Sequence, residues 1–595
     1  MSSNKACCWI LGIFAGGFVV TALVIGWGIS QAISGGFRGK LSSDAAIKPN
    51  TWLVLRTTDV IPEHNVEPDL GFLGGTGGSS LNDMLRAIDF AQDDPNISGI
   101  VLRPMGVTGM ATIRELREAL LEFRQGDKPI IAHFDIATDR DYYLASVSDS
   151  IFMMPGRLSG INFGGMAFSS TYLKSTFEKL GLKFHVIHAG KYKGAFEDFA
   201  RDSMSTELRT SLTYLYADVY ETYIRETASA RPNLTFEMLD HEVRAGDQFL
   251  VSAASCLDRG YVDGLVDWPV LRQRLQKDSE EFESVSAQKY LASKKLEQFP
   301  IHESEIAVLF AQGEISFGDD DGGWGEDGIT ASELVKQLDK LGEDESVKAV
   351  VLRVNSPGGS ALASKQILEA ALRLKEKKPI VVSMGRVAAS GGYYISMAAN
   401  EIVAQPNTIT GSIGVVTMIP SAEELYKKIG AREETISIGR WANFFRFDKT
   451  LGPEQEQVLN SLMDSVYLEF REDVAKGRNL ELASLDSLAE GRVWTGNQAM
   501  ARGLVDTLGG IDLAIRLAAA DANLGKDEYD LAYYPKEKDV FEFIVSKFST
   551  RFNALANLSD NVRALQDPKA MLKHVKSYFD RFEFLQTVLP ASIDV

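Results

Sequence analysis

The stretch that decides the fold is residues 379–412, PIVVSMGRVAASGGYYISMAANEIVAQPNTITGS. It begins with a β-branched apolar run at 380–382, which predicts a buried strand. Small residues follow, and from Tyr393 onward the pattern is typical of a helix. The turn at such a strand-to-helix junction would expose Ser390 beside free backbone N–H groups. Access and nearby N–H donors are two needs of a nucleophile, although a small residue at a tight helix–strand contact would give the same pattern.

The composition limits the classes of function. The chain has 595 residues, enough for several domains, and its 45% hydrophobic and 24% charged residues are ordinary for a globular protein. A net charge of −19 argues against nucleic acid as a partner, because phosphate binding needs basic patches. The three cysteines, Cys7, Cys8 and Cys256, allow no disulfide within the body and form no zinc-binding pattern. We therefore expect neither a metal nor a cofactor.

The N-terminal region contains a long uncharged stretch. Its most apolar part, residues 8–29, is about as long as a helix that spans a bilayer, which predicts one transmembrane anchor. A cleaved signal peptide is the alternative, because small residues at 32–35 could be a cleavage site. Positive residues flank both sides, so charge does not decide the orientation. No second apolar stretch of this length follows, and we expect the rest of the chain to lie on one side of the membrane.

The strongest sign of organisation is an internal repeat. The segment SGIVLR at 98–103 matches KAVVLR at 348–353, and KPII at 128–131 matches KPIV at 378–381. Both matches have the same offset of 250 residues. Self-similarity at a fixed offset indicates two copies of one fold.

The predicted domains follow from this repeat. The first copy covers about residues 50–270 and the second about 303–520. The Lys-, Glu- and Ser-rich segment 271–302 is predicted to be a charged helical linker, and 521–595 a C-terminal tail. Short apolar strands alternate with amphipathic helices such as 112–123 in each copy. This alternation predicts an α/β fold with a largely parallel sheet.

The two copies differ where chemistry would reside. The position of Ser390 falls on Asp139 or Arg140 in the first copy, which also lacks the two glycines after the serine. Conversely, Lys193 of the first copy meets an alanine or asparagine in the second. Such complementary losses are expected if one composite site takes one residue from each copy.

The histidine distribution restricts the possible base for Ser390. No histidine lies between residues 303 and 573, which excludes a Ser–His–Asp triad formed within the second copy. A lysine can act as the base when burial lowers its pKa toward neutrality. Tyr192 and Phe196 would give Lys193 apolar surroundings, although a lone lysine is more commonly a solvated surface residue.

Four segments together carry a family resemblance. They are NSPGGS at 355–360, VSMGRVAASGGYYIS at 382–396, TITGSIG at 408–414 and YKGAFEDF at 192–199. In this combination the chain resembles the signal peptide peptidase A family in its long, duplicated form. The resemblance covers nearly all of residues 50–520. The resemblance implies two tandem ClpP/crotonase-like repeats preceded by one transmembrane helix.

The same resemblance implies roles for individual residues. Ser390 would be the nucleophile, Lys193 the general base, and Ser412 the residue that orients the lysine. The oxyanion hole would be formed by backbone N–H groups of Gly358, Gly359 and Gly391.

The function implied is that of a membrane-bound serine endopeptidase that degrades cleaved signal peptides. The expected partners are these hydrophobic peptides, membrane lipid and further copies in a homotetramer. The expected location is the bacterial inner (cytoplasmic) membrane, with a single span and the catalytic body on the periplasmic side. A crotonase-type acyl-CoA enzyme and a non-catalytic scaffold on the same fold are the alternatives. Met384, Val387 and Ile413 are candidates for an apolar substrate groove, or else ordinary core residues.

Overall fold

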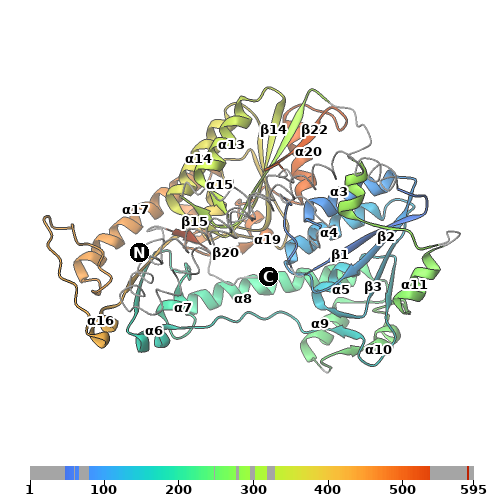
Figure 1. Ribbon diagram of the computed structural model, residues 1–595, viewed down its shortest axis with the longest axis horizontal. Helices are drawn as coiled ribbons and strands as arrows, with labels where there is room; N and C mark the ends of the chain where they lie inside the picture. The colour runs from blue at the N-terminus through green and yellow to red at the C-terminus, as the bar shows by residue number, and fades with distance from the viewer. Residues whose placement is uncertain are drawn as a thin grey trace, which may run out of the picture.

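The computed structural model describes residues 47–536, except 59, 66–78, 247, 277–280, 295–301 and 318–327, together with the backbone of 586–588 (Figure 1). The predicted anchor at 8–29 lies outside the described residues, as does most of the tail at 521–595. Among the helices that are described, none has the length and apolar character needed to cross a membrane.

A largely parallel sheet forms the centre of the first repeat, as the alternation of strands and helices predicts. Its strand order is β10-β1-β2-β3-β5-β9. The strands are β1 (Thr51–Thr57), β2 (Ile97–Pro104), β3 (Ile130–Phe134), β5 (Ser150–Met153), β9 (Gly264–Leu265) and β10 (Ser284–Ser286). Helices α3 (Leu81–Asp93) and α4 (Met110–Phe123) cover this sheet. The predicted helix at 112–123 is therefore confirmed as most of α4.

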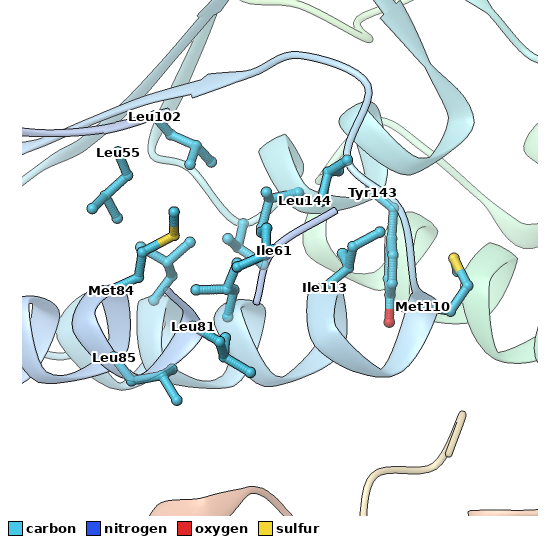
Figure 2. Packing of buried hydrophobic residues seen from close by; sticks show 14 of the residues in the cluster. Leu55, Ile61, Leu81, Met84, Leu85, Leu102, Met110, Ile113, Tyr143 and Leu144 are labelled. Atoms are coloured by element: carbon cyan, nitrogen blue, oxygen red, sulfur yellow. The ribbon is translucent and has the colours of Figure 1, made fainter. Parts of the chain in front are cut away.

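Local sequence explains why α3 begins and packs as it does. The Ser80 hydroxyl accepts a hydrogen bond from the backbone N–H of Asp83, and the Asp83 carboxylate accepts one from the backbone N–H of Ser80. Leu81, Met84 and Leu85 then follow at helical spacing and are buried. All three belong to the same buried cluster as Leu55 of β1 and Leu102 of β2, and Figure 2 shows Met84 directed toward Leu55.

The second repeat has a larger sheet with the order β20-β18-β16-β14-β11-β22, to which β17 and β21 add. Its strands are β11 (Glu305–Gln312), β14 (Val347–Ser356), β16 (Ile380–Ala389), β17 (Glu401–Ala404), β18 (Ile409–Gly411), β20 (Val493–Thr495), β21 (Thr507–Leu508) and β22 (Asp530–Tyr534). Helices α13 (Ala331–Glu343), α14 (Ala361–Lys375) and α20 (Ile511–Asp521) pack around it. The central strands are buried almost throughout, which is why they are continuous apolar runs. Because β22 pairs with β11, this sheet extends past residue 520.

The segment 271–302, predicted to be a linker, is part of the first repeat. Its strand β10 pairs with β1, and its helix α12 (Ala287–Lys294) packs against α3. The buried Tyr290 hydroxyl donates to the Asp94 carboxylate at 2.8 Å. Most residues of this segment are charged or polar, and only a few of those that the structure describes are buried. Composition alone therefore suggested a linker.

A third sheet joins the two repeats, in the order β13-β12-β15-β23-β19-β7. Its strands are β7 (Lys183–Ala189), β12 (Ile315–Ser316), β13 (Ile329–Thr330), β15 (Gly358–Ser360), β19 (Val415–Ser421) and β23 (Gln586–Val588). Strand β7 of the first repeat is antiparallel to β19 of the second, with Ala189 opposite Val415. This pairing determines which residues of the two repeats meet.

A buried ion network also joins the repeats. Arg353 on β14 donates to the Glu63 carboxylate at 2.9 Å and to the Glu115 carboxylate at 2.6 Å. All three side chains are buried. Loss of hydration raises the pKa of Glu63, an effect that the charge of Arg353 opposes. Both carboxylates belong to the first repeat, so the arginine of the second repeat holds the two cores together.

Candidate active site

Ser390 lies at the junction between β16 and α15 (Gly391–Ser396). Its backbone has φ of 57° and ψ of −114°, a conformation that a non-glycine residue adopts only under strain. The turn is held at both sides, because the Ser390 N–H donates to the Gly411 carbonyl and the Ser390 carbonyl accepts from the Tyr394 N–H, each at 2.8 Å. The predicted strand-to-helix junction is therefore present, and its strain is of the kind that clusters at active sites.

The expectation that this turn exposes the serine is wrong for this structure. Ser390 is 0% exposed. The Lys193 side chain lies against its hydroxyl, and the Gly411 carbonyl, next to Ser412, accepts its backbone N–H. Covering segments from elsewhere in the chain do not appear in a local sequence pattern.

The pairing of β7 with β19 brings Lys193 to the serine. Lys193 follows the end of β7 by a few residues, and β19 begins shortly after Ser412. Since the end of β7 lies opposite the start of β19, the lysine meets the segment that holds Ser412. The Lys193 Nζ atom is 2.6 Å from Ser390 Oγ, 3.0 Å from Ser412 Oγ and 2.9 Å from the Ser412 carbonyl.

The surroundings of Lys193 favour the neutral amine. The side chain is 1% exposed, so the surface-lysine alternative does not apply. Burial lowers the pKa of Lys193 well below the ordinary value for lysine. Its hydrogen bonds within the described residues go to two serines and no carboxylate, so no opposite charge offsets the loss of hydration. A neutral amine beside a hydroxyl can accept the proton of that hydroxyl.

Residues 490–492 support the lysine, and sequence reasoning missed them. The Tyr192 N–H donates to the Glu490 carbonyl at 2.8 Å, and the Ser412 N–H donates to the Arg492 carbonyl at 2.7 Å. Between them, Gly491 has φ of 75°, and a Cβ there would lie 2.6 Å from the backbone nitrogen of Lys193. No sequence signal identifies this glycine, because the contact joins positions about 300 residues apart.

The predicted oxyanion residues lie in two elements that pack together, β15 and α15. Gly358 and Gly359 form part of β15, and the Gly358 N–H donates to Ser356 Oγ at 3.2 Å. Gly391 is the first residue of α15, where a helix leaves its N–H groups without partners inside the helix. Strand β23 runs antiparallel along β15, so this edge accommodates an extended backbone.

The structure decides which residue of the first repeat corresponds to Ser390. The hydroxyls of Tyr142 and Tyr393 each donate to a backbone carbonyl at matching positions of the two repeats, at 2.9 Å and 3.0 Å. With these tyrosines equivalent, Ser390 corresponds to Asp139 and not to Arg140. Burial raises the pKa of Asp139 to about 6, and its carboxylate accepts two backbone N–H groups. The first repeat therefore has no serine at this position.

The three candidates for a substrate groove are core residues. Met384 and Ile413 are fully buried in the core of the second repeat, and Val387 is buried in the other main core cluster. The alternative interpretation as ordinary core residues is therefore the one that fits the structure.

The site as a whole defines a class of enzyme. A serine on a strained turn, a buried lysine within hydrogen-bond distance and nearby backbone N–H groups are the parts that a serine hydrolase with a lysine base requires. Among the described residues, no group of His, Cys, Asp or Glu is arranged to hold a metal ion.

Comparison with known proteins specifies the family. The model of peptidase family S49 matches residues 122–281 and 372–525, and the Clp protease model matches 325–410. Protease 4 of Salmonella typhi is 34% identical, over 90% of this chain and 88% of that protein. Protease 4 of Haemophilus influenzae is also 34% identical, over 75% of this chain and 74% of that protein. The chloroplastic serine protease SPPA of Arabidopsis thaliana is 33% identical, over 75% of this chain and 66% of that protein.

The chain belongs to peptidase family S49, with two S49 repeats on an α/β ClpP-like fold. Its activity class is that of a serine endopeptidase. The acyl-CoA and scaffold alternatives receive no support from these relatives.

Proposed function

We propose that Ser390 is the nucleophile, that Lys193 is the general base, and that Ser412 orients the lysine. The observation that carries this proposal is the 2.6 Å contact between Lys193 Nζ and Ser390 Oγ in a fully buried setting. Ser412 contacts the same Nζ atom through both its hydroxyl and its carbonyl. Two fixed acceptors restrict the rotation of the amine, so its lone pair can be held toward the Ser390 hydroxyl.

In the proposed reaction, neutral Lys193 takes the hydroxyl proton while Ser390 Oγ attacks the carbonyl carbon of a peptide bond. The carbonyl oxygen becomes an oxyanion, which backbone N–H groups of Gly391 and of Gly358 or Gly359 would stabilise. The C–N bond then breaks, and the Lys193 ammonium gives its proton to the leaving amine. Water, deprotonated by Lys193, hydrolyses the acyl-enzyme and restores the serine.

The substrates that we propose are the hydrophobic peptides left after signal-sequence removal. The motifs at 192–199, 355–360, 382–396 and 408–414 carry the resemblance that leads to this class. The pairing of β23 supports a substrate in extended conformation. This strand of the same chain runs antiparallel to β15 and pairs with β19 at Val416, which is how an extended peptide would bind at this edge. An edge that accepts main-chain hydrogen bonds binds peptides with little dependence on sequence.

We further propose that residues 8–29 anchor the chain in the bacterial inner membrane with the body on the periplasmic side. The charge-free stretch has the length of a bilayer span, which supports the anchor. Signal peptides remain in the same bilayer, so an anchored peptidase would be close to its substrates. The chain would act as a homotetramer.

The test uses the full chain in detergent and a synthetic signal peptide as substrate. We expect cleavage by the wild type, none by Ser390→Ala, and labelling of Ser390 by a fluorophosphonate. The control is Ser211→Ala, which removes another buried serine hydroxyl that takes no part in the hydrogen bonds of Lys193, and it should keep full activity. Cleavage by Ser390→Ala equal to that of the wild type would contradict the assignment of the nucleophile. Labelling of Ser390 without peptide cleavage would contradict the substrate class alone.

A further inference from the structure

In the sheet that joins the repeats, a strand of the first repeat (β7) pairs with a strand of the second (β19). Because the fold is duplicated, each of these two strands has a counterpart segment in the other repeat. At the offset of 249 residues that aligns this region, β19 corresponds to residues 166–172 and β7 to residues 432–438. The offset is supported by α6 (Lys174–Leu180) and α16 (Glu423–Ile429), which end at the equivalent glycines Gly181 and Gly430. Within the described residues, β7 pairs with β19, whereas neither counterpart segment pairs with a strand.

In the second repeat, the incoming strand fills a defined groove. Strand β7 lies against β19 and against helix α17 (Pro453–Gly477). Ile187 and Ala189 of this strand form a small apolar cluster with Leu459 and Met463 of α17. At the margin, His185 Nδ1 lies 3.2 Å from the Glu456 carboxylate.

The first repeat has a corresponding groove, and no strand of the described residues lies in it. Helix α8 (Thr206–Ala230) has the same 25-residue length as α17, so Leu212 and Tyr216 correspond to Leu459 and Met463. Leu212 and Tyr216 line a cavity of about 670 Å³. Met166 of the unpaired edge also lines this cavity.

The segment that corresponds to β7, residues 432–438, carries apolar side chains that could fill this cavity. Ile436 and Ile438 occupy the positions of Ile187 and Ala189, and they are 99% and 94% exposed. Two such isoleucines exposed on one extended segment mark an interaction surface, because apolar area of this kind is favourable to bury.

The charged pair at the margin is present with its signs exchanged. Glu434 corresponds to His185 on the strand, and Arg209 corresponds to Glu456 on the helix. Arg209 lines the cavity, and both Arg209 and Glu434 are exposed. The acidic Glu434 of the strand segment would therefore face the basic Arg209 of the groove, which is the electrostatic complementarity expected of an interface.

The strand and the groove of one chain lie in different parts of the molecule. In Figure 1 the loop after α16 projects at the left end, whereas the trace between 163 and 173 runs beneath α8 toward α9 (Phe236–Ala245) on the right. We propose that residues 432–438 of one copy dock as an antiparallel strand on residues 166–172 of a second copy of this chain. The register of β7 and β19 then places Ile438 opposite Met166 and Ile436 opposite Phe168 of the neighbour.

This contact is heterologous, since each copy offers one strand and one groove. Such head-to-tail contacts pass from copy to copy and end when a ring closes. The inference names the interface of the homotetramer proposed above. Ser390 and Lys193 meet within one chain, so the dyad is complete without this interface.

The experiment is a charge exchange, read by light scattering of the full chain in detergent after size-exclusion chromatography. We expect Glu434→Arg or Arg209→Glu alone to reduce the protein mass toward that of one 65.3 kDa chain. The double variant, which restores opposite charges, should recover the wild-type mass. A third variant, Ile436→Asp with Ile438→Asp, should dissociate the assembly most strongly, because charges would enter an apolar groove. Glu343→Arg makes the same charge change at an exposed position at the end of α13 and should leave the mass unchanged.

The outcomes separate this inference from the proposed catalytic function. A monomeric wild type, or single variants with the wild-type mass, would overturn the docking of 432–438. If the single variants dissociate and the double variant with exchanged charges also stays dissociated, Glu434 and Arg209 are not close to each other, and the proposed register is wrong. Fluorophosphonate labelling of Ser390, measured on the same samples, reports on the dyad independently of the mass.

Discussion

Replacing Lys193 by methionine tests the dyad most directly. Methionine keeps an unbranched, apolar side chain in the buried space and removes only the amine. Lys193 Nζ is the group within 2.6 Å of Ser390 Oγ, so its loss leaves the serine without a proton acceptor at that atom. General-base catalysis contributes about 10²–10⁴-fold, and we expect kcat to fall by that factor, or roughly 3–5 kcal/mol.

The combination with Ser390→Ala makes this prediction sharper. Members of a dyad act as one unit, so the double variant should be no less active than Ser390→Ala alone. The assay is cleavage of a synthetic signal peptide under single-turnover conditions. Clearly additive losses would refute the reasoning, because they would show that the two side chains act in separate steps.

The same variant changes how stability depends on pH. Burial lowers the pKa of Lys193 in the folded state, while the unfolded value is about 10.4. Between these two values the unfolded chain binds more protons, so the stability contributed by this site rises with pH and is lost as pH falls through the folded pKa. Denaturant unfolding at several pH values should show this slope in the wild type and a flatter one in Lys193→Met. An unchanged slope would mean that Lys193 is not perturbed by burial.

The remaining predictions concern residues around the dyad. Gly491→Ala should lower kcat at least tenfold with KM little changed, because the new Cβ would displace the Lys193 backbone; wild-type kcat would contradict this. Arg353→Met should cost about 3–5 kcal/mol in the free energy of unfolding, measured with urea, because Glu63 and Glu115 lose their buried partner; a loss below about 1 kcal/mol would show that the network does not hold the repeats together. A chain shortened to end before residue 586 should bind peptide with a lower KM, because β23 and an extended substrate use the same edge of β15; an unchanged KM would separate the two.

Much of this molecule follows from local sequence. The strand that contains 380–382 and the helix at 112–123 follow from apolar pattern, since each element must bury its apolar side chains regardless of its distant neighbours. The duplication appears as matched segments at a fixed offset, and the histidine-free second repeat left lysine as the base to consider for Ser390. These inferences need only the identity and spacing of residues along the chain.

Other features depended on tertiary structure. Asp139 could be chosen over Arg140 as the counterpart of Ser390 only after equivalent tyrosine hydrogen bonds were known. The sequence also assigned segment 271–302 to a linker, because the pairing of β10 with β1 spans more than 200 residues.

The burial of Lys193 beside Ser390 also depended on tertiary structure. It results from the antiparallel pairing of β7 with β19 and from the close approach of Gly491, contacts between segments that are about 200 to 300 residues apart. Periodicity records which face of an element is apolar, but not which element covers it. The partner of each strand edge, and hence the desolvation that lowers the pKa of Lys193, is set only when the two repeats pack together.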